Sequence, residues 1–482
     1  MGKALFWKLM ERFGVQGIQF VLQIVLARLL DPEHYGVLSI MVIFTSLANV
    51  FVQNGFNTAL IQNKDVTEED YSSVFWISLG IAGVMYGLIF LGAPFVAEFY
   101  AMPDIVAPLR VLSLMLFPGA MNSIQLAKVS REMDFKKVFY SNIGGILISG
   151  IVGIVIACMG GGLWALVAQS ILNILVACLV MLFTVHWRPR LVCNLRRVGE
   201  LFRFGWKLLV SGLLETLYQD LRSLVIGKKY DSGTLGYYNR GKQFPQFIIN
   251  AINGAIQSVM LPAMSAKQDD KGSVKDMMRM SMTMSAYIIF PMMAGLAAVA
   301  TPLVSLLLTD KWLPCVPYMQ VYCFTLAFYP VHSCNLQAIN AMGRSDLFLK
   351  LEIIKKSYGI AVLVMAVFCF DSPLAIAMTG LVTTWIGWFI NAFPNKKLIG
   401  YAYREQISDL LPILLAALGM FGLVSLSGVW CMSREFGNVL TLGIQILLGV
   451  AVYLSISVLV RLRPFMILLE QLKNVTKVMK RG

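Results

Sequence analysis

Charged residues are scarce in this chain. Asp, Glu, Lys and Arg make up 14% of its 482 residues, whereas an average soluble domain carries about 25%. Hydrophobic residues make up 58% of the sequence, and no polar stretch is long enough to form a separate soluble domain. The composition therefore excludes an ordinary soluble protein.

Reactive side chains are also few. The three histidines, His34, His186 and His332, lie far apart, and the sequence has no HExxH, Walker A or GxSxG motif. The eight cysteines are scattered and form no CxxC pair, which favours inert packing thiols over metal ligands or disulfides. We therefore expect no enzymatic activity and no bound cofactor. A membrane glycan polymerase or ligase is the alternative, but the short loops between apolar segments leave it little room for a catalytic site.

Apolar runs of membrane-spanning length recur along the whole chain. A helix of about 20 apolar residues crosses the hydrocarbon core, and backbone groups in lipid must be bonded within their own segment. The sequence thus predicts an all-α polytopic membrane protein with about 14 transmembrane helices. The expected spans are residues 7–30, 35–61, 72–98, 104–128, 136–158, 162–186, 201–229, 233–262, 275–308, 312–341, 346–369, 373–398, 406–430 and 435–461.

Basic residues are distributed unevenly over the loops. Most of the 40 Lys and Arg residues fall in one set of alternate loops and at both ends of the chain. The positive-inside rule then places both termini in the cytoplasm and the protein in the cytoplasmic (inner) membrane. This topology accounts for the net charge of +14 without nucleic-acid binding. The basic tail, residues 463–482, has one apolar face and is expected to lie on membrane lipids.

The two halves of the sequence match when one is shifted by 200 residues. Asp31, Gly36 and Gln19 then fall on Asp231, Gly236 and Gln219. With a shift of 212, Pro118 falls on Pro330 and Gln125 on Gln337. We expect two six-helix bundles related by a parallel repeat, residues 1–200 and 201–400. Residues 401–482 would add two transmembrane helices and the basic tail. In transporters built this way, the substrate site lies between the repeats.

Polar side chains recur along single faces of several spans. In the span 233–262, six amides follow one line at intervals of three and four residues: Asn239, Gln243, Gln246, Asn250, Asn253 and Gln257. Arg12, Gln16, Gln19 and Gln23 follow the same spacing in the first span. A single buried amide usually bonds a neighbouring helix. A whole line of amides instead predicts a hydrated cavity, since amides facing lipid would lose their hydrogen bonds.

Five ionisable residues interrupt the apolar spans 201–229 and 233–262: Glu215, Asp220, Arg222, Arg240 and Lys242. Each would cost about 2.5–3.5 kcal/mol at the bilayer centre if it faced lipid. They must therefore be paired or look into water. Three bases against two acids leave positive charge, so the substrate should be anionic. A diphosphate suits the basic groups, and the neighbouring amides suit sugar hydroxyls. Internal ion pairing alone is the competing interpretation.

Three segments resemble the polysaccharide-transport (Wzx-type) branch of the MOP superfamily of exporters, which also contains the MATE transporters. They are LARLLDPEHYGVLSIMVIFTSLANVFVQNGFNTALIQ (26–62), VSREMDFKKV (129–138) and RSLVIGKKYDSGTLGYYNRGKQFPQ (222–246). The resemblance implies a flippase for polyprenyl-diphosphate-linked oligosaccharides, working by alternating access. Its product would feed O-antigen, capsule or exopolysaccharide assembly, alongside polysaccharide polymerase machinery.

The resemblance also suggests roles for individual residues. Arg240 is the first candidate for binding the diphosphate, followed by Lys242 and Arg12; Arg222 is added as a candidate because the helix spacing predicts that it shares their depth. Glu215 and Asp220 are the candidates for carrying a coupling ion, H⁺ or Na⁺. Two alternatives from the same superfamily stay open: a peptidoglycan lipid flippase and a cation-coupled multidrug exporter.

Overall fold

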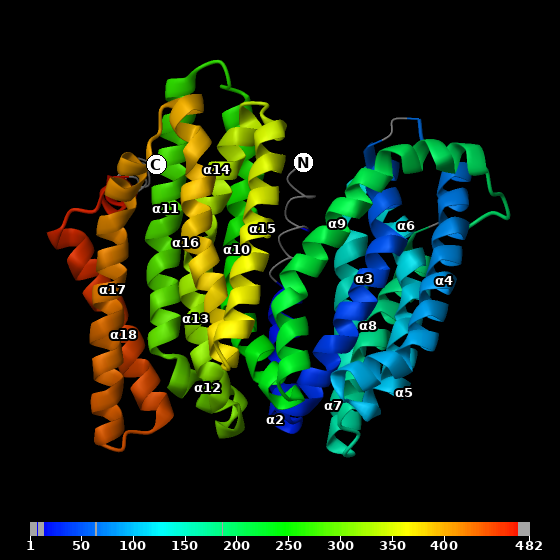
Figure 1. The fold of residues 1–482 in the computed structure, drawn as a ribbon, viewed down its shortest axis with the longest axis horizontal. Helices are drawn as coiled ribbons and strands as arrows, with labels where there is room; N and C mark the ends of the chain where they lie inside the picture. Colours follow the sequence, from blue (N-terminus) through cyan, green and yellow to red (C-terminus); the bar gives the residue numbers. More distant parts are fainter. Residues whose placement is uncertain (1–6, 8–13, 63–64, 186, 471–482) are drawn as a thin grey trace, which may run out of the picture. The chain divides into compact units, whose positions relative to one another are not determined.

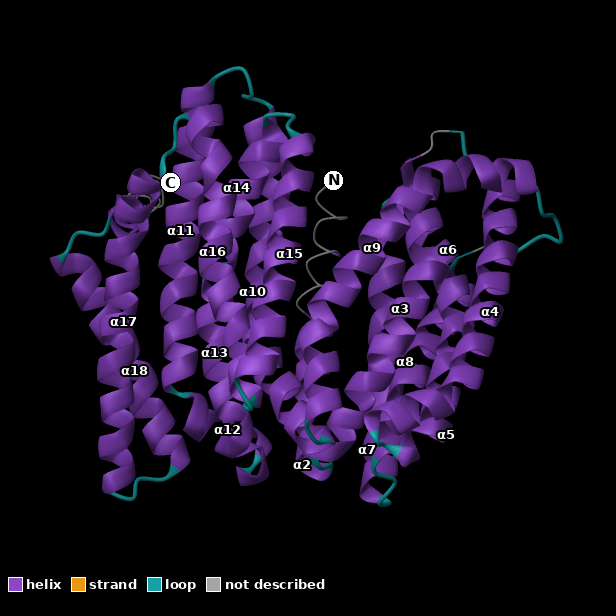
Figure 2. Cartoon of the chain, viewed as in Figure 1, coloured by secondary structure: helices purple, strands orange, loops and turns teal. Residues whose placement is uncertain are grey.

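The computed structural model describes residues 7, 14–62, 65–185 and 187–470, and these residues form helices joined by short connections, with no strand among them (Figure 2). The long helices of the first half are α2 (Gln16–Leu29), α3 (Pro32–Gln62), α4 (Glu68–Tyr100), α5 (Val106–Leu112), α6 (Leu116–Glu132), α7 (Phe135–Cys158), α8 (Leu163–Thr184) and α9 (Leu195–Lys229). Those of the second half are α10 (Ser232–Ser265), α11 (Lys271–Ala298), α12 (Ala300–Leu308), α13 (Val316–Ala327), α14 (Tyr329–Ala341), α15 (Ser345–Cys369), α16 (Pro373–Ile399), α17 (Tyr403–Ser433) and α18 (Asn438–Leu459). Short 3₁₀ turns precede α5, α6 and α13: η2 (Pro103–Ile105), η3 (Ser113–Met115) and η4 (Asp310–Cys315).

Nine of the described helical segments are long and apolar enough to cross a membrane. Helices α9 and α10 are not among them, and these are the helices that carry the embedded charges and the line of amides. Their polarity makes them unlike helices that face lipid on all sides. The all-α membrane architecture expected from the sequence is therefore confirmed.

Three of the expected spans are divided by proline. A proline lacks the backbone N–H and its ring clashes with the carbonyl four residues earlier. The expected span 275–308 accordingly breaks at Val299, three residues before Pro302. The breaks before α6 and α14 precede Pro118 and Pro330, the pair related by the shift of 212. The span bounds expected from hydropathy did not include these breaks, and two of the breaks occur at repeat-related positions.

Polar side chains bond the carbonyls near the break at Val299. Gln320 Nε2 donates to the carbonyl oxygen of Ala297 over 3.1 Å, and Gln445 Nε2 lies 3.5 Å from that of Ala298. Backbone groups inside a membrane need such replacement partners where a helix is interrupted. The break is therefore a stabilised feature of the fold.

The first turns of α3 and α10 cross in direct contact. A Cβ added to Gly36 would overlap the carbonyl oxygen of Ser232, and one added to Gly236 would overlap the carbonyl oxygen of Pro32. Gly36 and Gly236 are 200 positions apart, and so are Pro32 and Ser232. The two contacts are therefore equivalent under the repeat. Only glycine allows two helix backbones to approach so closely. The parallel repeat is thus visible as a symmetric helix crossing.

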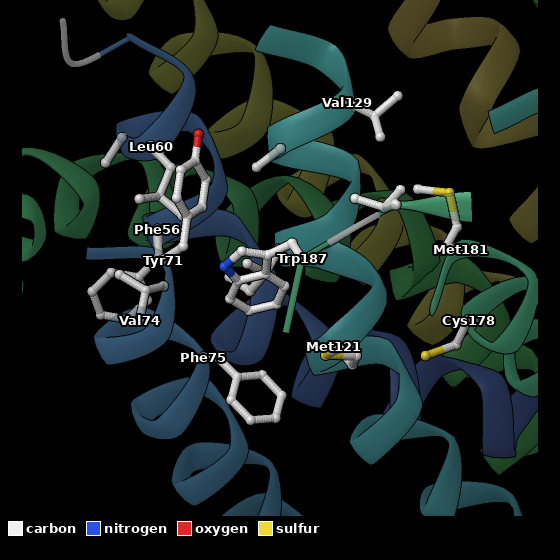
Figure 3. Packing of buried hydrophobic residues seen from close by; sticks show 14 of the residues in the cluster. Phe56, Leu60, Tyr71, Val74, Phe75, Met121, Val129, Cys178, Met181 and Trp187 are labelled. Carbon is white, nitrogen blue, oxygen red and sulfur yellow. The ribbon is translucent and has the colours of Figure 1, made fainter. Parts of the chain in front are cut away.

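The chain packs as two compact units, Met1–Asn239 and Arg240–Gly482. In the N-terminal unit α7 packs against α8, and α9 packs along α3 (Figure 1). A buried cluster joins α3, α4, α6 and α8 to the residues before and within the start of α9. Trp187 lies in this cluster with Tyr71, Phe75 and Met121 (Figure 3). The division of the chain into repeats at residues 1–200 and 201–400, followed by residues 401–482, stays a prediction.

In the C-terminal unit, a buried amide network ties α17 to the preceding helices. Asn335 of α14 and Gln406 of α17 exchange hydrogen bonds of 3.2 and 3.1 Å, and Trp388 Nε1 of α16 donates to Gln406 Oε1 over 3.1 Å. Two ion pairs add to this: Arg279 with Asp409 at 2.5 Å and Lys275 with Glu405 at 2.6 Å. The first of the two added helices is therefore an integral part of this unit.

Candidate functional site

The predicted site begins in the hairpin formed by α9 and α10. Asp231 stands between the two helices and caps α10, because its carboxylate accepts hydrogen bonds from the Thr234 backbone N–H at 2.9 Å and from the Thr234 hydroxyl at 2.7 Å. Burial alone would raise the pKa of Asp231, but these hydrogen bonds outweigh it and hold the pKa below its usual value. Further along, the Ser223 hydroxyl donates to Asn239 Oδ1 over 3.1 Å. These bonds hold the two helices in register.

The three basic residues lie near the same end of this hairpin. Arg222 is seven residues from the end of α9, which is about 10 Å along the helix. Arg240 and Lys242 lie eight and ten residues after the start of α10, about 12 and 15 Å along it. Arg222 and Lys242 are each partly exposed. That these three residues share one depth in the membrane stays a prediction. Arg222 belongs to the N-terminal unit, whereas Arg240 and Lys242 belong to the C-terminal unit.

Arg240 is enclosed by other side chains, with 4% of its surface exposed. Its guanidinium carbon lies 5.1 Å from the centroid of the Trp312 ring, and Nη1 donates to Gln243 Oε1 over 2.6 Å. The tryptophan is fully buried. A guanidinium over an indole face in a desolvated place gains cation–π stabilisation. Arg240 thus has a fixed orientation, set by an aromatic face and an amide.

Glycine places Arg240 in this position. A Cβ on Gly241 would lie 2.7 Å from the carbonyl oxygen of Cys315 and 2.8 Å from the backbone nitrogen of Met319. The third turn of α10 is therefore pressed against the junction of η4 and α13. This contact brings Arg240 beside Trp312, a residue of η4 that is 72 positions away in the sequence.

The line of amides continues along α10 below the basic residues. Gln243 and Gln246 are partly exposed, and Asn250 is exposed. Gln246 Nε2 donates to Asn250 Oδ1 over 2.8 Å. The side chains of Asn253 and Gln257 lie outside the described residues. Asn239 and Gln243 instead accept hydrogen bonds from Ser223 and Arg240, so only Gln246 and Asn250 are bonded within the line.

The remaining predicted residues lie on α9 and α2. Glu215 is exposed and accepts a hydrogen bond of 2.8 Å from Gln219 Nε2, and Asp220 is partly exposed. Glu215 lies 14 residues from the end of α9, about 21 Å along the helix. Gln19 and Gln23 of α2 are partly exposed. Arg12 lies outside the described residues. The part of the chain that the structure describes has no cluster of three metal-binding side chains.

A second polar cluster in the C-terminal unit was missed by the sequence analysis. Lys355 and Glu352 of α15 form an ion pair, and the Tyr358 hydroxyl donates to the Thr383 carbonyl oxygen over 2.6 Å. His332 Nδ1 lies 3.1 Å from Asn391 Nδ2. Gly387 makes room for them, since a Cβ there would be 3.1 Å from the Tyr358 hydroxyl. The only sequence pattern that could have indicated this cluster is the three-residue spacing of Glu352 and Lys355. That spacing is also typical of an ordinary ion pair on a helix surface.

Comparisons with known proteins cover most of the chain. A family model described as "Polysaccharide biosynthesis protein" matches residues 25–317. The lipopolysaccharide biosynthesis protein WzxC of Escherichia coli (strain K12) is 24% identical over 420 residues, 85% of this chain and 84% of WzxC. The succinoglycan biosynthesis transport protein ExoT of Rhizobium meliloti (strain 1021) is 22% identical over 414 residues, 84% of this chain and 83% of ExoT.

Solved structures show the same fold. The lipid II flippase MurJ in its inward closed conformation matches with a TM-score of 0.76 and 17% identity, over 95% of this chain and 99% of MurJ. An inward-facing multidrug resistance MATE family transporter of the MOP superfamily matches with a TM-score of 0.60 and 15% identity, over 81% of this chain and 98% of the transporter. The expected MATE/MOP-like architecture is therefore confirmed. At these identities the likeness extends to the fold alone.

Proposed function

The chain belongs to the polysaccharide biosynthesis protein family, and on that premise we propose that it is a flippase. It moves polyprenyl-diphosphate-linked oligosaccharide units across the cytoplasmic membrane by alternating access, for assembly of O-antigen, capsule or exopolysaccharide. The observation that carries the proposal is the family match, together with relatives named for lipopolysaccharide and succinoglycan biosynthesis that align with more than four fifths of the chain.

The basic residues of the α9–α10 hairpin are proposed to hold the diphosphate. Arg240 offers a planar, two-pronged donor, which matches phosphate oxygens better than an ammonium group does. Lys242 and Arg222 lie at a similar depth along the hairpin and would add charge. Arg12 would add a fourth positive group on the first span. Support comes from the excess of bases over acids within these spans, which favours an anionic substrate.

The amides beside these basic residues are proposed to bind the sugar units. An amide both donates and accepts hydrogen bonds, as a hydroxyl does. Six side chains are proposed for this role: Asn239, Gln243, Gln246, Asn250, Gln19 and Gln23. Several partly exposed amides would bind weakly and allow the oligosaccharide to slide, which suits a transporter more than a tight receptor.

Glu215 and Asp220 are proposed to couple transport to an ion gradient. Both are carboxylates in the expected span 201–229, where an ionisable group is costly unless it is paired or hydrated and is a candidate for function. Glu215 lies near the middle of α9, and its bond with Gln219 leaves part of the carboxylate exposed. A proton or Na⁺ bound there would neutralise the acid during the transport cycle.

Two exporters of the same fold are the competing functions. A multidrug exporter binds cations and should carry net acidic groups in its central helices, whereas α9 and α10 carry more bases than acids within their spans. A peptidoglycan lipid flippase shares the chemistry of a lipid diphosphate. The family match favours polysaccharide cargo over both.

Reconstitution tests the proposal. The full chain is inserted into liposomes that contain a polyprenyl-diphosphate-linked oligosaccharide with a fluorescent label on its sugar, and an impermeant quencher is added outside. We expect the protected inner fraction to become accessible much faster than in liposomes without protein. A cationic dye serves as the matched alternative substrate. Transport of the dye with no movement of the lipid-linked sugar would overturn the proposal.

A further inference from the structure

The segment from Trp187 to Arg203, named here the strap, links α8 to the membrane-crossing part of α9. Its backbone is bonded to α4: the Arg190 and Asn194 N–H groups donate to the Ser72 and Ser73 hydroxyls at 3.1 and 2.9 Å. Trp76 Nε1 donates to the Arg190 carbonyl oxygen at 2.8 Å. In Figure 1 the first turns of α9 run across the end of the unit before the helix turns to follow α3. The strap is thus an ordered part of the N-terminal unit.

The inner face of the strap is firmly attached. Trp187, Val198 and Leu201 are buried in the apolar cluster of this unit (Figure 3). Arg197 donates two hydrogen bonds of 3.1 Å to the carboxylate of Asp70, which is 3% exposed. This paired geometry is the strongest arrangement of arginine and carboxylate. The strap therefore has one defined orientation on the unit.

The bonds to α4 set the depth of the strap along that helix. Ser72 and Trp76 lie four and eight residues after the start of α4 at Glu68, about 6 and 12 Å along it. The first turn of α4 is acidic, with Glu68, Glu69 and Asp70, and the helix is mainly apolar after Ser73. The strap therefore lies where the surface changes from polar to apolar, which is the level of lipid headgroups.

The outer face of the strap is apolar and basic together. Leu191 is 91% exposed and Leu195 is 71% exposed. Four arginines that are not engaged by Asp70 flank them, all exposed: Arg188, Arg190, Arg196 and Arg203. Glu200 is the one acidic residue of the strap. Leucines facing outward between basic residues are typical of an element that lies in a membrane interface.

We propose that the strap binds anionic phospholipid headgroups. Leu191 and Leu195 enter the boundary of the acyl chains, and the arginines contact the phosphates. The positive-inside count places this loop on the cytoplasmic side, whose leaflet attracts basic segments. The strap would thereby fix the start of α9 to the membrane surface. This inference is independent of the transported substrate.

A native cysteine makes the test direct. Cys193 lies within the strap and is exposed. With Cys158 and Cys369, the other exposed cysteines, changed to serine, the full chain carries one accessible thiol for an environment-sensitive dye. The protein is held in neutral detergent–phosphatidylcholine micelles, and phosphatidylglycerol is added stepwise. We expect a blue shift of the dye emission that saturates. Changing Arg188, Arg190 and Arg196 to Gln should weaken the affinity by roughly fivefold per arginine.

Two further variants separate the strap from general charge effects. Lys350, Lys396 and Lys397 are exposed basic residues of the C-terminal unit, and changing all three to Gln should leave the response unchanged. Leu191→Ser with Leu195→Ser should reduce the blue shift. Equal emission in neutral and anionic lipid, or an equal loss in the control variant, would overturn the proposal.

Discussion

Arg240 shows how one charged residue can be placed inside a membrane protein. Its guanidinium is enclosed by Trp312 and bonded to Gln243, so the charge sits in a polarisable, hydrogen-bonded environment. Gly241 makes this possible by allowing α10 to touch the start of α13. The residue is therefore held in a defined orientation by an aromatic face and an amide.

Substitutions at Arg240 and Trp312 test this orientation. We expect Arg240→Lys to lower the rate of lipid-linked oligosaccharide translocation nearly as much as Arg240→Ala, by about 10- to 100-fold, because a hydrogen bond to a charged group contributes ~1.5–3 kcal/mol. Trp312→Phe should retain most activity, since an aromatic face remains, whereas Trp312→Leu should not. Arg344→Ala, at an exposed loop arginine paired with Asp346, is the control. Full activity of Arg240→Ala would remove this residue from the mechanism.

At the scale of elements, the crossing of α3 and α10 is the most constrained contact between repeat-related helices. Its four residues occupy equivalent positions in the two halves, and glycine is needed at two of them. The proline breaks before α6 and α14 are a second repeated feature. The crossing depends on glycine having no side chain, and the breaks depend on proline having no backbone N–H. Both features occur twice because the helices that carry them are repeated.

Gly236→Ala should destabilise the protein. The added methyl group would overlap the Pro32 carbonyl oxygen, and relieving such overpacking costs about 1–3 kcal/mol. Thermal unfolding of the purified protein in detergent should therefore begin at a lower temperature than in the unchanged protein. Gly80→Ala is the matched control, because a Cβ there meets nothing within 4 Å. An equal midpoint for Gly236→Ala and Gly80→Ala would show that the two helices do not cross closely.

At the scale of the whole molecule, the distribution of Lys and Arg over the loops predicts the orientation in the membrane. Labelling of the exposed native cysteines can test this orientation. Cys158 and Cys369 end helices on the side assigned to the exterior, and Cys193 lies in a loop assigned to the cytoplasm. With single-cysteine variants in intact spheroplasts, an impermeant maleimide should label Cys158 and Cys369. It should label Cys193 only after permeabilisation. The reverse pattern would invert the topology.

Fold and site differ in how far they could be predicted. The membrane helices follow from runs of apolar residues, and their observed ends lie within a few residues of the predicted ends for most spans. The proline breaks could have been predicted from Pro118, Pro302 and Pro330, but a hydropathy profile alone does not reveal where a helix is interrupted. Of the site, the line of amides and the depth of the basic residues followed from spacing. The burial of Arg240 did not, because Trp312 is distant in sequence.

The sequence by itself determined the membrane class, the helices, the parallel repeat and the excess of basic over acidic residues within the spans 201–229 and 233–262, because these depend on composition and on spacing along one chain. Only the tertiary structure decided which polar side chains meet: Arg240 with Trp312, Gln406 with Asn335, Arg197 with Asp70. Each pair joins elements far apart in the chain. A side chain's partner depends on how helices pack, and helix packing is a property of the assembled fold.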